Sequence, residues 1–283
     1  MRLDKFLADM GVGSRSDLKK AIRKSLVTVN GAVEKDPGAQ VSAEDHICFD
    51  GAEIRYAEQQ YYMLHKPAGV LSASEDRRQT TVVDLINLND ELVRKDLFPV
   101  GRLDKDTEGL LIITNDGPLA HQLLVPKHHI DKTYYAIVTG TITEDDQRAF
   151  SRGIRYDEKL TALPATLRVL STGKTVADLR RELGFTATSK RLLRTRLAGP
   201  AFIGAEEPAD ITEDSLVSEV EITIQEGKFH QIKKMVKALP GGKEILYLRR
   251  ITMGALRLDP HLAPGEFRKL RQDEIKILKD SVE

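Results

Sequence analysis

The residues best suited to chemistry lie in one short segment near the middle of the chain, residues 101–111, which reads Gly-Arg-Leu-Asp-Lys-Asp-Thr-Glu-Gly-Leu-Leu. Its acidic side chains are Asp104, Asp106 and Glu108. The apolar run at residues 110–113 overlaps the end of this segment and is typical of a buried strand. Removing a carboxylate from water costs several kcal/mol unless a partner stabilises its charge. The pattern therefore favours a carboxylate that acts as a nucleophile or a base in a partly dry site.

Two other interpretations of residues 101–111 have to be weighed. A solvated turn would leave the acids exposed and without a chemical task. A calcium loop of the EF-hand type would begin at Asp104 and needs a bidentate Glu at its twelfth position. That position holds Asn115, and the second half of the segment is the apolar strand. The calcium interpretation therefore fails.

Later segments add residue types that suit the same chemistry. Residues 132–136 read Lys-Thr-Tyr-Tyr-Ala, and residues 226–235 read Glu-Gly-Lys-Phe-His-Gln-Ile-Lys-Lys-Met. Residues 246–254 read Leu-Tyr-Leu-Arg-Arg-Ile-Thr-Met-Gly, and an earlier strand, residues 61–66, is halted by a Pro-Ala-Gly turn. Together these segments offer an aromatic face, several cations and an apolar strand. A carboxylate in a dry pocket needs a nearby cation to stay ionised.

Residues 101–111 resemble the signature of the pseudouridine synthases, G-R-L-D-x-x-[ST]-x-G-L-[LM]. The later segments resemble the same family's K-x-Y motif and its E-G-[KR]-x-H-Q-[IV]-[KR]-[KR]-M motif, and residues 65–67 resemble its first motif. Enzymes of this family break the N-glycosidic bond of a uridine, turn the uracil over and remake the link at carbon 5. The resemblance implies a redox-neutral isomerisation that needs neither a metal nor an organic cofactor.

The resemblance also implies a role for individual residues. Asp104 would attack or deprotonate the ribose, Tyr134 would lie flat against the target base, and Lys233 would pair with Asp104. Stacking on an aromatic side chain is worth about 1–3 kcal/mol per base, a useful part of the cost of extruding a base from folded RNA. The side chains implied to bind substrate are Arg102, Leu248, Lys66 and Lys228.

Residues 1–58 are predicted to form a separate small domain. Ser14 with Asp17 gives a capping-box pattern that starts its second helix, and residues 26–31 predict a strand followed by a tight turn. This module resembles the S4 RNA-binding domain, except that Ser25 stands where that family usually has Gly. A solvated helix face is the alternative for its lysines. The cations implied to contact RNA are Arg2, Lys5, Arg15, Lys19, Arg23 and Lys24.

Residues 61–283 are predicted to form the catalytic domain. Alternating strands and amphipathic segments indicate an α+β fold with a mixed, mostly antiparallel sheet. They include a strand at residues 217–224 and a helix at residues 230–239. Residues from about 171 to 216 fit the family least well, because relatives pass quickly between the two strands that flank them. This segment is predicted to be an inserted helical lobe.

The composition narrows the possible environment and partners. The formal net charge is zero over 283 residues, but basic residues are clustered, so a polyanion such as RNA can still bind. One cysteine, Cys48, excludes an internal disulfide and fits a reducing compartment. The N-terminus lacks the apolar run of a signal peptide, and no segment is apolar enough to span a membrane. We therefore expect a cytoplasmic protein, most simply a monomer. His121, His128 and His129 have no acid or Cys at ligand spacing, so no metal site is expected.

Within the superfamily the chain most resembles the RsuA branch, whose members modify one uridine in 16S ribosomal RNA. The expected partner is therefore ribosomal RNA or an assembly intermediate of the small subunit. A 23S enzyme of the same family is one alternative, because close cousins share both domains. A non-enzymatic S4-type ribosome-assembly factor is another, although intact Asp104, Tyr134 and Lys233 argue against it. An RNA glycosylase on the same scaffold has no specific support.

Overall fold

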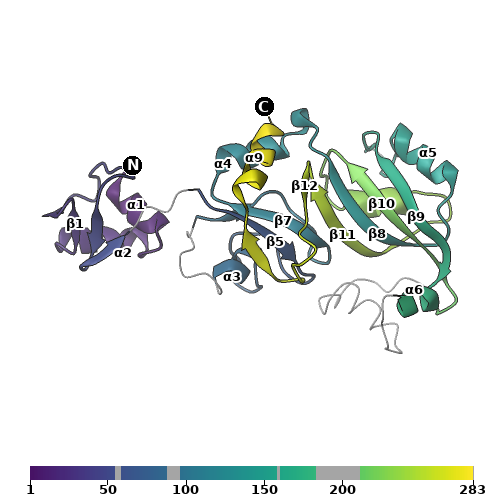
Figure 1. Cartoon of the computed structure of the whole chain (residues 1–283), viewed down its shortest axis with the longest axis horizontal. Helices are drawn as coiled ribbons and strands as arrows, with labels where there is room; N and C mark the ends of the chain where they lie inside the picture. Colours follow the sequence, from purple (N-terminus) through teal and green to yellow (C-terminus); the bar gives the residue numbers. More distant parts are fainter. Residues whose placement is uncertain (55–58, 88–95, 158–159, 183–210, 283) are drawn as a thin grey trace.

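The protein has a small N-terminal unit and a large sheet, each with its own hydrophobic core (Figure 1). The computed structural model describes residues 1–54, 59–87, 96–157, 160–182 and 211–282. Within these residues, no helix combines the length and apolar character needed to cross a bilayer. The first long buried strand of the large sheet begins at Tyr61.

The N-terminal unit packs two helices on a four-stranded antiparallel sheet of order β2-β1-β3-β4. Helix α2 begins where the capping pattern predicts, since the Asp17 N–H donates to the Ser14 hydroxyl at 3.2 Å. Asn30 and Gly31 have φ values of 52° and 82°, as a tight type I′ hairpin requires. The elements are α1 (Leu3–Asp9), α2 (Arg15–Arg23), β1 (Val27–Val29), β2 (Ala32–Val33), β3 (Ile47–Phe49) and β4 (Ala52–Ile54).

Ser25 occupies a left-handed backbone position directly after α2. Its φ is +65°, and its N–H donates to the carbonyl of Ile22 at 3.0 Å, which closes the end of the helix. An L side chain is disfavoured in this region, whereas glycine adopts it freely. The sequence departure at Ser25 therefore carries a backbone strain.

The large sheet is mixed and mostly antiparallel, as the sequence predicts. Among the described residues its strands run in the order β13-β5-β7-β11-β8-β10-β9, with β12 beside β11 and β6 beside β7. The only parallel neighbours among these described strands are β7 and β11. The strands are β5 (Tyr61–Lys66), β6 (Phe98–Pro99), β7 (Glu108–Thr114), β8 (Lys132–Thr139), β9 (Thr166–Thr175), β10 (Leu216–Ile224), β11 (Ile245–Met253), β12 (Leu256–Arg257) and β13 (Phe267–Lys269).

Two hydrophobic cores cover parts of the large sheet because neighbouring side chains of a strand point to opposite faces. In β7, Leu111 and Ile113 join one core, whereas Leu110 and Ile112 join the other. Both strands β5 and β7 are buried along their whole length. The helices are α3 (Val82–Asn87), α4 (Gly117–Leu124), α5 (Glu144–Arg152), α6 (Val176–Glu182), α8 (Gln231–Lys237) and α9 (Gln272–Asp280), with a short 3-10 turn, η1 (Pro126–His128).

The segment predicted to be an inserted helical lobe begins differently from that prediction. Residues 171–175 continue strand β9, and Val217 pairs with Lys174 while Leu216 pairs with Thr175. The first part of the insert is therefore an extension of the β9–β10 pairing. Helix α6 then follows, and Val176 and Leu179 pack on Ile137 of β8. Residues 183–210 of this predicted lobe lie outside the described residues.

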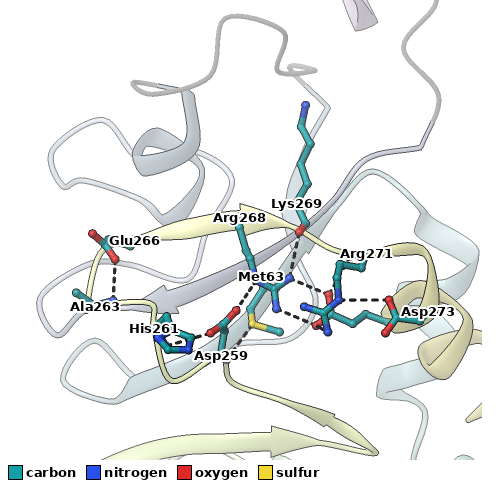
Figure 2. A network of polar contacts seen from close by, with 10 residues as sticks. Met63, Asp259, His261, Ala263, Glu266, Arg268, Lys269, Arg271 and Asp273 are labelled. Carbon is teal, nitrogen blue, oxygen red and sulfur yellow. Dashed lines mark hydrogen bonds and ion pairs between the residues drawn. The ribbon is translucent and has the colours of Figure 1, made fainter.

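The C-terminal segment is tied to the edge of the sheet by a network around Arg268 (Figure 2). The guanidinium of Arg268 donates to Asp259 at 2.7 Å and to Glu274 at 2.8 Å. The Glu274 carboxylate, and then Asp259, raise the pKa of Arg268 above its usual value. These bonds fasten β13 to α9, and β13 in turn pairs with β5. The network thus holds the strand that carries Lys66.

Candidate active site

Asp104 lies in a tight loop between β6 and β7, here called the acidic loop (residues 101–107). The N–H of Thr107 donates to the backbone carbonyl of Asp104 at 3.1 Å, which closes a turn that begins at Asp104. The hydroxyl of Ser72 donates to the Leu103 carbonyl at 2.9 Å and accepts from the Leu103 N–H at 3.1 Å. Ser72 thus fixes the residue before Asp104, a contact that no sequence pattern indicated.

Lys66 is buried beneath this loop and does not line the pocket beside Asp104, contrary to its predicted role in substrate binding. Its side chain is 0% exposed, and Nζ donates to the carbonyls of Pro67, Lys105 and Thr107 at 3.0, 3.2 and 2.9 Å. Burial lowers its pKa to about 8, although the nearby carboxylates oppose this shift, Asp106 most strongly. The ammonium therefore holds the acidic loop from beneath.

Gly109 explains why the segment must contain glycine directly before its apolar run. Its φ is +106°, and a Cβ at this position would lie 2.2 Å from the carbonyl oxygen of Arg250. Gly109 pairs with Arg250 in the parallel contact between β7 and β11. Only a residue without a side chain permits this approach. The approach brings β11, which carries Leu248, beside the acidic loop.

Lys233 of α8 supplies the cation beside Asp104. Its Nζ lies 3.2 Å from Oδ2 of Asp104 and 2.5 Å from Oδ1 of Asp106, so two carboxylates share one ammonium. His230 adds a second nitrogen, with Nε2 3.6 Å from Oδ1 of Asp104. The Asp104 side chain is 24% exposed, and the Lys233 side chain is similarly covered. The site combines an accessible carboxylate with neighbouring positive charge.

The third acid of the segment faces a different environment. Glu108 is buried, and the hydroxyl of Tyr247 donates to its Oε2 at 2.8 Å. Burial raises the pKa of Glu108, and the hydrogen bond from Tyr247 opposes that shift. Glu108 therefore joins β7 to β11 below the loop, whereas Asp104 opens to the surface.

A pocket that is open to solvent lies beside Asp104. Tyr134 of β8 and Leu248 of β11 are nearly buried and provide apolar lining from adjacent strands. Arg102, Lys228 and Lys233 bring positive charge to the same pocket. Thus six of the seven predicted catalytic and substrate-binding residues meet here, and Lys66 is the exception. Residues that line the pocket without a predicted role are Leu103, Thr107, Ile224, Gly227, His230, Gln231 and Ile232.

A buried carboxylate organises the turn between β10 and α8. Glu226 pairs with Lys228 at 2.8 Å, accepts from Gln231 Nε2 at 2.6 Å, and accepts from the Leu163 N–H at 2.9 Å. The Lys228 N–H in turn donates to Gln231 Oε1 at 2.9 Å. Glu226 and Gln231 were visible in the sequence motif, but their task is clear only from these contacts. They fix the backbone that presents Lys228 and His230 to the pocket.

The cations of the N-terminal unit are arranged around a buried acid. Asp4 is fully covered, and its carboxylate lies 3.1 Å from Arg2, 3.3 Å from Arg15 and 4.0 Å from Lys19. Lys5 pairs instead with Asp9 at 2.9 Å, and the predicted RNA-binding residues Arg23 and Lys24 are exposed. The hydrogen bond from Arg2 is the main cause that lowers the pKa of Asp4 to about 2, and Arg15 adds to it.

The lowered pKa of Asp4 predicts that the N-terminal unit loses stability at acidic pH. Because its folded pKa of about 2 lies below the ordinary value of 3.8, its stabilisation is present above that value and disappears as the pH falls through the folded pKa. We expect Asp4→Asn to lower the free energy of unfolding by about 1–2 kcal/mol near neutral pH. The deficit should shrink between about pH 4 and pH 2. Urea unfolding followed through NMR signals of Leu18 measures it, and a pH-independent deficit contradicts the assignment.

No group of three or more potential ligands among His, Cys, Asp and Glu within the described residues is arranged to hold a metal ion. The three histidines considered from the sequence, His121, His128 and His129, belong to α4, to η1 and to the residue after it. His129 is left-handed, with φ 49°, and ends the 3-10 turn.

Comparison with known proteins identifies both units. The model of the RNA pseudouridylate synthase family matches residues 60–238, and the S4 domain model matches residues 1–47. An uncharacterised RNA pseudouridine synthase of Bacillus subtilis, YtzG, is 38% identical over 281 residues, which cover 99% of each chain. A ribosomal small subunit pseudouridine synthase A of Pasteurella multocida is 33% identical, covering 97% of this chain and 98% of its own length.

A relative with a different target and a solved structure complete the comparison. A ribosomal large subunit pseudouridine synthase B of Bacillus subtilis is 33% identical, covering 98% of this chain and 95% of its own length. The crystal structure of a pseudouridylate synthase aligns with a TM-score of 0.58 and 32% identity, covering 98% of this chain and 99% of the other. The chain belongs to the RNA pseudouridylate synthase family and carries an S4 domain at its N-terminal end.

Proposed function

We propose that this pseudouridine synthase isomerises a specific uridine of ribosomal RNA and that its target lies in the small-subunit 16S RNA. The observation that carries the proposal is the carboxylate of Asp104, held 3.2 Å from Lys233 at a pocket lined by Tyr134 and Leu248. Small-subunit enzymes among the full-length relatives support the choice of target. The large-subunit relative supports 23S RNA as the second candidate.

In the proposed reaction Asp104 attacks the ribose or removes a proton from it, and the N-glycosidic bond to uracil breaks. The uracil then rotates in the pocket and bonds to the ribose through carbon 5, whose proton is released. Tyr134 and Leu248 hold the detached base between apolar surfaces while it turns. Lys233 stabilises the Asp104 carboxylate when bound RNA excludes water. Arg102 and Lys228 are suited to hold the RNA backbone at the rim.

A direct assay distinguishes the candidate targets. Transcripts of 16S and 23S RNA labelled with 5-tritiated uridine release tritium when a uridine becomes pseudouridine. We expect release from the 16S transcript at one site, identified by pseudouridine mapping of RNA from a deletion strain. Release from 23S RNA alone would move the target to the large subunit. RNA binding without release would support an assembly factor, and an abasic site would support a glycosylase.

We also propose that the S4 domain binds ribosomal RNA or a small-subunit assembly intermediate, and that the enzyme acts as a cytoplasmic monomer. The cations Arg2, Arg15 and Lys19 gather around Asp4, which limits their freedom before RNA arrives. An ordered set of positive charges can meet several phosphates with a smaller cost in side-chain entropy. The domain boundaries proposed for this arrangement are residues 1–58 and 61–283.

Removal of residues 1–58 is expected to weaken RNA binding and to make it less sensitive to salt. Every phosphate that the shortened protein no longer neutralises should reduce the slope of log affinity against log salt by roughly 0.7–0.9. The single-turnover rate at saturating RNA should remain, because every residue lining the pocket belongs to the large sheet or to the loops and helix α8 around it. Filter binding at several salt concentrations measures the slope. An unchanged affinity and slope would show that the cations of the N-terminal unit are merely solvated.

A further inference from the structure

Phe229 presents an aromatic ring to solvent at the edge of the active-site pocket. Its side chain is 76% exposed, the highest value among the large apolar residues that the structure describes as exposed. Both sequence neighbours, Lys228 and His230, line the pocket. A single exposed apolar residue is common on protein surfaces, so exposure alone does not indicate a partner. The observation that matters is the place of this ring, between two residues that line the pocket.

The Phe229 ring is held in a defined orientation although it is exposed. It stacks on the imidazole of His230, with ring centroids 3.8 Å apart and planes inclined by 18°. His230 has a left-handed backbone, with φ 52° and ψ 30°, and precedes α8. Such a conformation is strained for a residue with a side chain, and strain of this kind gathers at functional sites. The turn places the two rings face to face.

The ring also lies close to the reacting carboxylate and to positive charge. Nε2 of His230 is 3.6 Å from Oδ1 of Asp104, so a single imidazole separates the Phe229 ring from Asp104. Nζ of Lys234 lies 5.8 Å from the centroid of the same ring. An aromatic face beside ammonium groups suits a nucleotide, because the base can stack while the phosphate meets the cation.

We propose that Phe229 is the stacking platform for the unpaired base next to the target uridine. The proposal rests on the proposed function and extends it by one nucleotide of substrate. When the uridine leaves its stack to reach Asp104, one face of the adjoining base is uncovered, and this base remains covalently tied at the pocket rim. A planar ring at that rim covers the face again. Phe229 thereby lowers the free-energy cost of extrusion and acts as a substrate-binding residue outside the pocket itself.

Substitutions at Phe229 separate stacking from simple bulk. Phe229→Tyr keeps a flat ring and should retain activity, whereas Phe229→Ala and Phe229→Leu should lower kcat/KM by about 5- to 150-fold. Leucine is the matched control because it preserves apolar volume without a π face. At saturating RNA the rate constant of the chemical step should change less than kcat/KM. Equal kcat/KM for wild type, Phe229→Leu and Phe229→Ala would overturn the proposal.

A fluorescence measurement tests the same interaction without catalysis. The chain contains no tryptophan, so Phe229→Trp in an Asp104→Asn background introduces a single reporter. Binding of the ribosomal transcript that the wild-type enzyme modifies should quench this tryptophan. Ile277→Trp in the same background places the control reporter on α9, at a residue that is 36% exposed, and should not respond. Equal responses of the two reporters would overturn the proposal.

The two measurements also separate this inference from the proposed function. If the wild-type protein releases tritium and the Phe229 variants behave like wild type, only the stacking platform is wrong. If the wild-type protein releases no tritium from either ribosomal transcript, the proposed function fails first. Thermal unfolding of each variant is the folding control, and an exposed ring should be replaceable without a large decrease in stability.

Discussion

Asp104→Asn is expected to reduce turnover by at least about 10³-fold while RNA binding survives. The amide keeps the size of the side chain and can still accept a hydrogen bond from Lys233, but it is neither a nucleophile nor a base. Tritium release from labelled ribosomal RNA measures turnover, and filter binding measures affinity. Because Asp104 is partly exposed, the substitution should leave the fold intact.

Asp106→Asn is the matched control for this substitution. Asp106 belongs to the same acidic loop and contacts the same ammonium, at 2.5 Å from Lys233, yet it does not line the pocket. We expect this variant to retain most of the activity, because Asp104, the carboxylate that we propose to react, remains. If Asp104→Asn keeps a sizeable part of the wild-type rate, or if Asp106→Asn is the more damaging change, then Asp104 is not the catalytic carboxylate.

Lys233→Met should cripple turnover nearly as strongly as Asp104→Asn, although the ammonium need not touch a reacting bond. Without Lys233 the carboxylates of Asp104 and Asp106 have no shared cation, and their mutual repulsion is no longer compensated. The substitution should disturb the geometry of the acidic loop and lower the reactivity of Asp104. Lys233→Arg should keep much of the activity, since a guanidinium preserves the charge and can bind carboxylate oxygens at two points.

The neighbouring residue on α8 provides the control for Lys233. Lys234 carries the same charge, but its Nζ lies 3.9 Å from Asp157 and close to the Phe229 ring at the rim of the pocket. Lys234→Met should weaken RNA binding slightly and leave the single-turnover rate at saturating RNA nearly unchanged. If the Lys233→Met enzyme is almost as fast as wild type, Lys233 is not the cation that supports Asp104, and Lys228 becomes the next candidate for that role.

The residues that meet at the pocket could be predicted because the motifs that carry them are specific in type and spacing. Asp104, Tyr134 and Leu248 come from distant segments, and the sheet order brings their elements together through the β7–β11 and β11–β8 pairings. The sequence pattern also predicted the cap at Ser14, the hairpin at Asn30 and the mixed sheet. In each case the structure that the local sequence favours agrees with the structure that tertiary packing requires.

The predictions that were wrong, and the roles that the sequence did not reveal, share one physical cause: they depend on contacts between distant segments. The sequence predicts that Lys66 binds substrate because its motif ends a strand beside the cleft, but carbonyls of the acidic loop surround this ammonium. The roles of Ser72, Glu108 and Glu226 depend on partners far away in the chain, which local patterns do not reveal. The prediction for the start of the insert was wrong because strand β9 continues by pairing with β10, and pairing is a property of two segments.

The sheet order has a consequence for how the protein folds during its synthesis on the ribosome. Strand β7, which follows the acidic loop, lies between β5 and β11, and β5 receives its outer neighbour only from β13 near the C-terminus. The hydrophobic core of the S4 domain is formed entirely by residues 1–54, whereas the catalytic sheet needs strands that are far apart in the sequence. The two units should therefore fold at different times during synthesis. Chains stalled before β11 should therefore contain a protease-resistant S4 domain and a protease-sensitive remainder, and equal sensitivity of the two parts would contradict this order. The nascent chain therefore completes its RNA-binding domain before its catalytic domain is complete.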